Sequence, residues 1–234
     1  MSHEIIFSAV FIVLGLAVGF AFYKLAKHQI KVRCERMPEL AEKYNPNFLQ
    51  NKWVLPVWEI LFALLYFLSY YIFKENIVSI IFSIIFISCS INIMFIDIAI
   101  RRIPNELLAT LLICSLVCNI ANPLIYNGNL KNQVVMCILG LVVGFVVFLL
   151  PQKLGIYIGS GDIKLSAVIG FSLGVLGYLQ AMVIMAVIMV IYLLILLITK
   201  RGGLKTMAPM GPALSAGAVI TVLLPILSNN VELF

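Results

Sequence analysis

Eight apolar runs divide this chain, and they constrain its fold more than any other feature of the sequence. They cover residues 5–23, 54–73, 77–96, 106–126, 132–151, 162–179, 181–199 and 208–227. A helix that crosses the hydrocarbon core of a bilayer needs about 20 predominantly apolar residues. Charged residues make up 11% of the chain, whereas soluble domains carry about 25%. The sequence therefore predicts an all-α, polytopic membrane protein with about eight transmembrane helices.

The basic residues are concentrated in alternate connections between these runs. Fourteen of the 16 Lys and Arg residues lie in four connections, namely Lys24, Lys27, Lys31, Arg33, Arg36, Lys43, Lys52, Arg101, Arg102, Lys153, Lys164, Lys200, Arg201 and Lys205. Connections rich in Lys and Arg stay in the cytoplasm. We therefore expect both termini outside and the charged loops inside, next to anionic lipid headgroups. This distribution accounts for the net charge of +6, so a nucleic-acid partner is not expected.

The domain organisation follows from the one polar stretch. Segment 24–53 is too short for a hydrophobic core of its own. We expect a single integral membrane domain over residues 1–234, with 24–53 as a short cytoplasmic segment and 54–227 as the helical bundle. The first apolar run has no basic residue before it and many after it. That order is the reverse of a cleavable signal peptide, so the run is predicted to be a retained span.

The chain contains only two aspartates, Asp97 and Asp162. Asp97 follows the third apolar run and Asp162 opens the sixth, so the predicted topology places both at the cytoplasmic face. Ionisable residues at membrane depth usually face a bundle interior or a water-filled cavity. Two carboxylates that meet there share one proton. Such a pair can act as general base and general acid in the hydrolysis of a peptide bond.

Each aspartate also has a purely structural interpretation. Asp162 is suited to cap a helix, and Asp97 is one turn away from Arg101, with which it can pair. For either residue alone the structural interpretation is favoured, but for both together we favour the catalytic one. Gly159 and Gly161 fit this hypothesis, because backbone without a side chain can turn tightly and approach another chain closely, an extended substrate included.

Four segments resemble a known family. "GSGDIKLSAVIG" (159–170) resembles the GxGD-K-[LM] signature of the type IV prepilin peptidases, a branch of the GxGD intramembrane aspartyl proteases. "DIAIRRIPN" (97–105) resembles their first catalytic segment, "APMGPALSAGA" (208–218) a late segment, and "LPVWEILFALLYF" (55–67) one of their spans. The resemblance extends from about residue 54 to 218.

The resemblance implies an aspartic endopeptidase in the bacterial cytoplasmic (inner) membrane. It would cleave the leader peptide of type IV prepilins or pseudopilins at the cytoplasmic membrane face. Asp97 and Asp162 would be the catalytic pair, and Lys164 would modulate their charge, hold a loop or anchor to lipid headgroups. The residues assigned to support of the active site are Gly159, Gly161, Lys164, Pro104, Asn105, Pro209, Gly211 and Pro212.

Departures from the family pattern concern its cofactors. Many members bind zinc through two CxxC pairs, but segment 24–53 contains only Cys34, and the other four cysteines lie in apolar runs, so no zinc or other metal is predicted. Many members also methylate the new N-terminus with S-adenosylmethionine. The altered N-terminal region here puts that activity in doubt, and Glu59, which matches a family glutamate, has either a methyl-transfer or a structural role. Proteolysis itself would need no cofactor.

Two other functions remain as alternatives. "GPAL" (211–214) contains the Pro-Ala-Leu of presenilin-like and signal-peptide-peptidase-like proteases, but the residues around Asp97 differ from theirs. A proton-coupled transporter could use two aspartates as a relay. Transporters usually show internal duplication, and this sequence shows none that is convincing.

Overall fold

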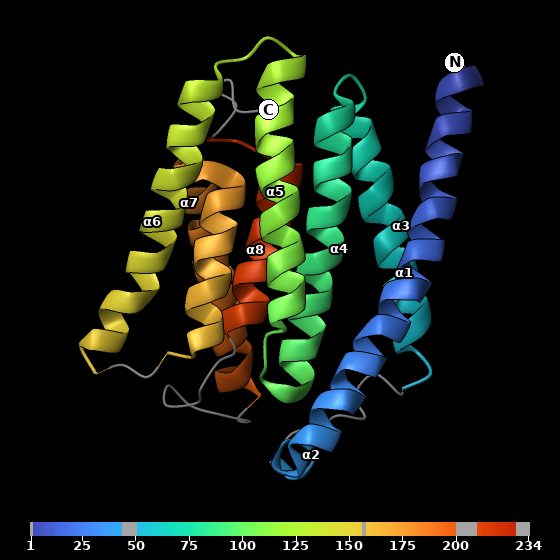
Figure 1. Cartoon of the computed structure of the whole chain (residues 1–234). Coiled ribbons are helices and arrows are strands. Elements are labelled where there is room, and N and C mark those ends of the chain that lie inside the picture. Colours follow the sequence, from blue (N-terminus) through green and yellow to red (C-terminus); the bar gives the residue numbers. More distant parts are fainter. Residues whose placement is uncertain (1, 44–50, 156–157, 200–209, 228–234) are drawn as a thin grey trace.

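The computed structural model describes residues 2–43, 51–155, 158–199 and 210–227, and all of its regular elements are helices (Figure 1). They are α1 (Ser2–Arg36), α2 (Pro38–Lys43), α3 (Val54–Phe73), α4 (Ile77–Ile100), α5 (Asn105–Ile125), α6 (Leu130–Lys153), α7 (Ser160–Ile198) and α8 (Met210–Leu223). Six of these helices are long and apolar enough to cross a membrane, and α8 is a shorter apolar helix. The prediction of an all-α polytopic membrane protein is confirmed.

Helix α7 is broken at Gly174, where the chain reverses direction. Gly174 has φ 68° and ψ 175°, a conformation that is essentially restricted to glycine. The hydroxyls of Ser166 and Tyr178 are 2.7 Å apart, although twelve residues of a straight helix rise about 18 Å. The two arms of α7, residues 160–173 and 175–198, therefore correspond to the sixth and seventh predicted spans. Their boundary lies at residue 174, not at residue 180 as the sequence suggested.

Polar side chains from α5 and α6 satisfy the backbone next to this break. Asn119 donates from Nδ2 to the carbonyl oxygen of Ser172 at 3.3 Å, and Gln133 donates to Oδ1 of Asn119 at 3.1 Å. Oγ of Ser115 lies 2.6 Å from Oγ of Ser172. Irregular backbone at membrane depth is tolerated only where the protein itself supplies hydrogen bonds. These contacts explain why apolar helices carry buried amides at this level.

The reversal places the helix ends that flank the basic connections at one end of the bundle. In Figure 1, α4 ends, α5 begins, and α7 both begins and ends at the lower end, which also holds the end of α1. We call it the aspartate end, because Asp97 and Asp162 lie there. Lys74 and Lys131 belong to the connections at the opposite end. For the residues that the structure describes, the alternation of charge in the sequence is thus a separation of charge between the two ends of the fold.

Helix α1 is longer than the apolar run that predicted it. It continues to Arg36, through half of the segment that the sequence suggested was a polar loop. Lys, Gln, Arg and Glu are good helix formers, and the first proline after the run is Pro38. A helix of this length rises about 50 Å, so its end extends past the bundle at the aspartate end.

Helix α4 lies at the centre of the bundle and is the most buried of the long helices. It packs against α1, α3, α5 and α8. The side chains of Phe86, Ile93 and Ile96 are completely buried. Since Asp97 is next in sequence, this packing fixes the position of its carboxylate.

Close backbone contact joins α6 to the first arm of α7. A Cβ atom added to Gly140 would overlap the backbone oxygen of Gly170, and the reverse is also true. Small residues allow helices in lipid to approach to this distance. Gly144, four residues further along α6, makes a similar contact with the backbone oxygen of Ser166.

We predict that Gly140→Ala destabilises the protein by about 1–3 kcal/mol, because the added methyl group must push α6 away from α7. The thermal midpoint of the purified protein in detergent measures this change. Val142→Ala is the matched control, since Val142 lies on the same helix and is 48% exposed. Equal midpoints for the two variants would show that the two backbones are not in contact.

Candidate active site

Asp97 occupies the last turn of α4 and is 7% exposed. The helix ends at Arg101, which adopts the left-handed conformation with φ 52°. The backbone N–H of Arg101 donates to the carbonyl oxygen of Asp97 at 2.9 Å. This cap turns the chain sharply away and leaves the carboxylate of Asp97 inside the bundle.

Asp162 occupies the first turn of α7 and is half-buried. Gly159 is the N-cap, and the N–H of Asp162 donates to the Gly159 carbonyl oxygen at 3.0 Å. A carboxylate in this turn interacts favourably with the positive end of the helix dipole. A Cβ atom on Gly159 would lie 3.1 Å from Oδ2 of Asp162. Because Gly159 has no side chain, this carboxylate oxygen is not crowded.

Gly211 of α8 brings the two carboxylates to one point. A Cβ atom added to Gly211 would lie 2.7 Å from Oδ2 of Asp97 and 3.1 Å from Oδ1 of Asp162. The separation of these two oxygens is therefore no greater than the sum of those distances. One water molecule can bridge such a gap, because each of its two hydrogen bonds measures about 2.8 Å. The two carboxylates interact electrostatically, and the positive charge of Arg101 acts on both.

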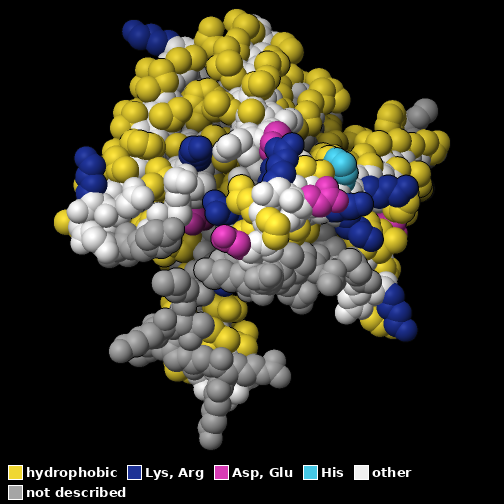
Figure 2. Space-filling view, turned by 60° about the horizontal axis from the view of Figure 1, so that its bottom comes forward, with side chains coloured by type: hydrophobic (Ala, Val, Ile, Leu, Met, Phe, Trp, Pro, Cys, Tyr) yellow, Lys and Arg dark blue, Asp and Glu magenta, His cyan; other side chains and the backbone are white. Residues whose placement is uncertain are grey.

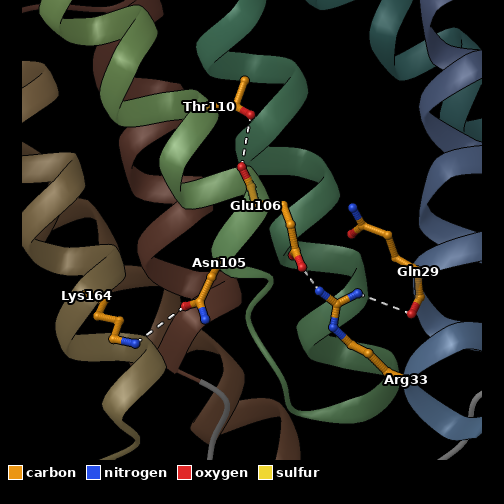
Figure 3. Close-up of polar contacts among 6 residues, drawn as sticks. All are labelled: Gln29, Arg33, Asn105, Glu106, Thr110 and Lys164. Carbon is orange, nitrogen blue, oxygen red and sulfur yellow. Dashed lines mark hydrogen bonds and ion pairs between the residues drawn. The ribbon is translucent and has the colours of Figure 1, made fainter. Parts of the chain in front are cut away.

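The connection between α4 and α5 holds the start of α7. A Cβ atom on Gly161 would lie 3.3 Å from Cβ of Ile103, so the bare backbone of Gly161 faces this connection. Pro104 is buried and is the N-cap of α5. Nζ of Lys164 donates to Oδ1 of Asn105 at 3.5 Å, as Figure 3 shows. Two of the residues from the GxGD segment thus contact the segment that follows Asp97.

The structure brings together most, but not all, of the residues that the sequence singled out. Pro212 is buried beside Gly211, whereas Pro209 lies outside the described residues. Glu59 is half-buried on α3. Its neighbour Trp58 contacts Phe95 of α4 at 4.3 Å between ring centroids. No described contact joins Glu59 to either aspartate.

Two residues of this site were not recognised from the sequence. Ile103 reads as an ordinary apolar residue, and only the folded chain reveals its contact with Gly161. Arg101 was considered only as an ion-pair partner of Asp97. Its spacing of four residues from Asp97 could have indicated a joint position on the helix, but its left-handed backbone has no sequence signal.

Comparison with known families decides between the remaining interpretations. Residues 84–195 match the model of the type IV leader peptidase family. Residues 84–195 belong to the type IV leader peptidase family. This range contains Asp97, Asp162 and the α4–α5 connection, and it favours a leader peptidase over the presenilin-like and transporter alternatives. No curated protein and no solved structure gave a significant match.

The match of residues 84–195 to this family indicates a peptidase, and the geometry indicates how it could work. Among the described residues, no group of three His, Cys, Asp or Glu side chains could hold a metal ion. The titratable groups that do converge are the two carboxylates beside Gly211. They are the acid and base candidates that this peptidase presents.

We predict that Gly211→Ala lowers the rate of leader-peptide cleavage at least tenfold. The new methyl group would displace the carboxylates, and a displacement of 1 Å can cost about 100-fold in rate. Ile220→Ala, at a residue of α8 that is 39% exposed, should cleave at the wild-type rate. If Gly211→Ala retained full activity, the contact between α8 and the carboxylates would not be part of the active site.

Proposed function

We propose that the protein is a membrane-embedded aspartyl endopeptidase that removes the leader peptide of type IV prepilins or pseudopilins. One observation carries this proposal: Asp97 and Asp162, which both lie in the range that matches leader peptidases, converge beside Gly211 of α8. Burial of Asp97 in the bundle and the wider opening at Asp162 suit a site that water and a peptide must both reach.

The proposed reaction uses the carboxylates in different protonation states. In the proposed reaction the two carboxylates hold a single proton between them, as carboxylate pairs of this kind do. The ionised member takes a proton from a water molecule, whose oxygen attacks the carbonyl carbon of the scissile peptide bond. The protonated member then gives its proton to the leaving nitrogen as the carbon–nitrogen bond breaks. The products are a carboxylic acid and a new N-terminal amine, so no metal ion or other cofactor is required.

The substrate's apolar segment has a suitable surface next to this site. An apolar hollow of about 390 Å³ is lined by Ile98 and Arg101 from α4, by Tyr192 from α7 and by Pro212 from α8, among others. Ile98 and Pro212 are sequence neighbours of Asp97 and Gly211. A membrane-embedded substrate could lie in this hollow with its cleavage site at the carboxylates.

The concentration of Lys and Arg supports a cytoplasmic position for the aspartate end. On this proposal the site lies at the cytoplasmic face of the bacterial inner membrane. Leader peptides of membrane substrates would be accessible there before the mature protein is exported.

Asp97→Asn and Asp162→Asn should each lower the rate of prepilin cleavage by about 100-fold to 10,000-fold, the usual contribution of a general acid or base. Asparagine keeps the shape of the side chain but neither accepts nor donates the required proton. Cleavage of a co-expressed prepilin, detected as a shift in its electrophoretic mobility, measures the effect. Glu75→Gln is the control, because it removes a carboxylate at the opposite end. Full cleavage by either Asn variant would refute the acid–base pair.

We also propose that the chain acts without zinc and without methyl transfer from S-adenosylmethionine. Cys34 is the only cysteine between residues 24 and 53, and the N-terminal region departs from the family pattern. Glu59 has no hydrogen-bonding partner among the described residues. Its neighbour on α3, Trp58, packs against Phe95 of α4.

The mass of the mature pilin tests the absence of methylation. We expect the product of the wild-type enzyme to carry an unmodified N-terminal amine, and we expect Glu59→Gln to cleave close to the wild-type rate. A product heavier by one methyl group, with the extra mass lost in Glu59→Gln, would assign methyl transfer to Glu59 and contradict this part of the proposal.

A further inference from the structure

A second cavity lies at the aspartate end, outside the catalytic pair. It has a volume of about 400 Å³ and is enclosed by the C-terminal part of α1, the start of α2 and the α4–α5 connection. Apolar side chains, among them Leu25, Val32 and Leu40, form one part of its wall. Leu25 lies two residues beyond the apolar run of α1 and is 37% exposed. The apolar wall is therefore continuous with the surface that α1 offers to lipid.

The other part of the wall is mostly cationic. Arg33, Arg36 and Arg102 line the cavity together with His28 and one acidic residue, Glu106. Arg33 is already paired, because its Nη2 lies 2.7 Å from Oε2 of Glu106 and its Nη1 donates to the Gln29 carbonyl oxygen at 3.2 Å (Figure 3). Arg36 and Arg102 have no acidic partner among the described residues. Figure 2, which brings this end forward, shows Lys and Arg side chains around a histidine.

We propose that this cavity binds the headgroup of an anionic phospholipid. The phosphate would lie on the guanidinium groups of Arg36 and Arg102, which suit phosphate geometry. An acyl chain would follow the apolar wall along α1. Phosphatidylglycerol combines these two features.

The cavity shares two residues with the frame of the catalytic pair. Ile103 and Asn105 line the cavity, and the same residues contact Gly161 and Lys164 at the start of α7. A lipid bound there would hold the α4–α5 connection against the turn that carries Asp162. We therefore expect the bound lipid to raise peptidase activity. This effect rests on the proposed function, whereas the binding of the lipid does not depend on it.

The test compares two double variants of the full-length protein in detergent. Arg36→Gln/Arg102→Gln removes two charges from the cavity. Lys31→Gln/Lys153→Gln removes two charges from the same end but outside the cavity. We expect phosphatidylglycerol to bind the wild type and the control equally and the cavity variant at least about tenfold more weakly, as measured by native mass spectrometry. It should also raise the thermal midpoint of the wild type and the control only.

Three other results would overturn the proposal. Equal binding to both double variants would mean that only the general positive charge attracts the lipid. Equal binding of phosphatidylcholine to the wild type would show that the anionic headgroup is not recognised. If inorganic phosphate or glycerol phosphate bound as well as the lipid, the cavity would belong to a soluble phosphate compound.

The activity measurement separates this proposal from the proposed function. If phosphatidylglycerol binds as expected but no prepilin is cleaved, the lipid site stands and the peptidase proposal fails. If cleavage occurs at the same rate with and without the bound lipid, the link through Ile103 and Asn105 is refuted.

Discussion

The approach of α8 to two carboxylates is the contact on which the rest of this structure depends. Gly211 faces both Asp97 and Asp162, and the absence of a side chain there leaves them space. Helix α4 fixes Asp97 by packing on all sides, and the first turn of α7 fixes Asp162 by its N-terminal hydrogen bonds. Much of the bundle can be understood as support for these two positions. The reversal at Gly174 returns α7 to the same end, so that α8 can begin beside the pair.

The segment after Asp97 performs several tasks within a few residues. Arg101 ends α4 and places its charge near both carboxylates. Ile103 packs on the turn before Asp162, and Asn105 binds Lys164. The same short connection forms a wall of the cavity beside α1. This connection therefore contacts the catalytic pair, the start of α7 and the cavity beside α1, and a displacement of the connection would alter all three.

Sequence patterns predicted the parts of this fold that depend on composition and periodicity. The long apolar helices, the separation of basic residues and the convergence of two isolated aspartates all follow from where lipid tolerates charge. The end of α1 was missed because its charged residues favour a helix that hydropathy does not detect. The break at Gly174 was misplaced by several residues, since tertiary packing selects which glycine of α7 takes a positive φ. The ion pair between Arg33 and Glu106 joins residues that are remote in sequence, and no local sequence pattern predicts it.

The position of Gly211 on the last described helix has a consequence for biosynthesis. While the chain is being made, Asp97 and Asp162 enter the bilayer well before α8 leaves the ribosome. Until then the pair lacks the contact with Gly211 that closes it on one side. On the proposed function, the complete site therefore forms only when synthesis of α8 is complete.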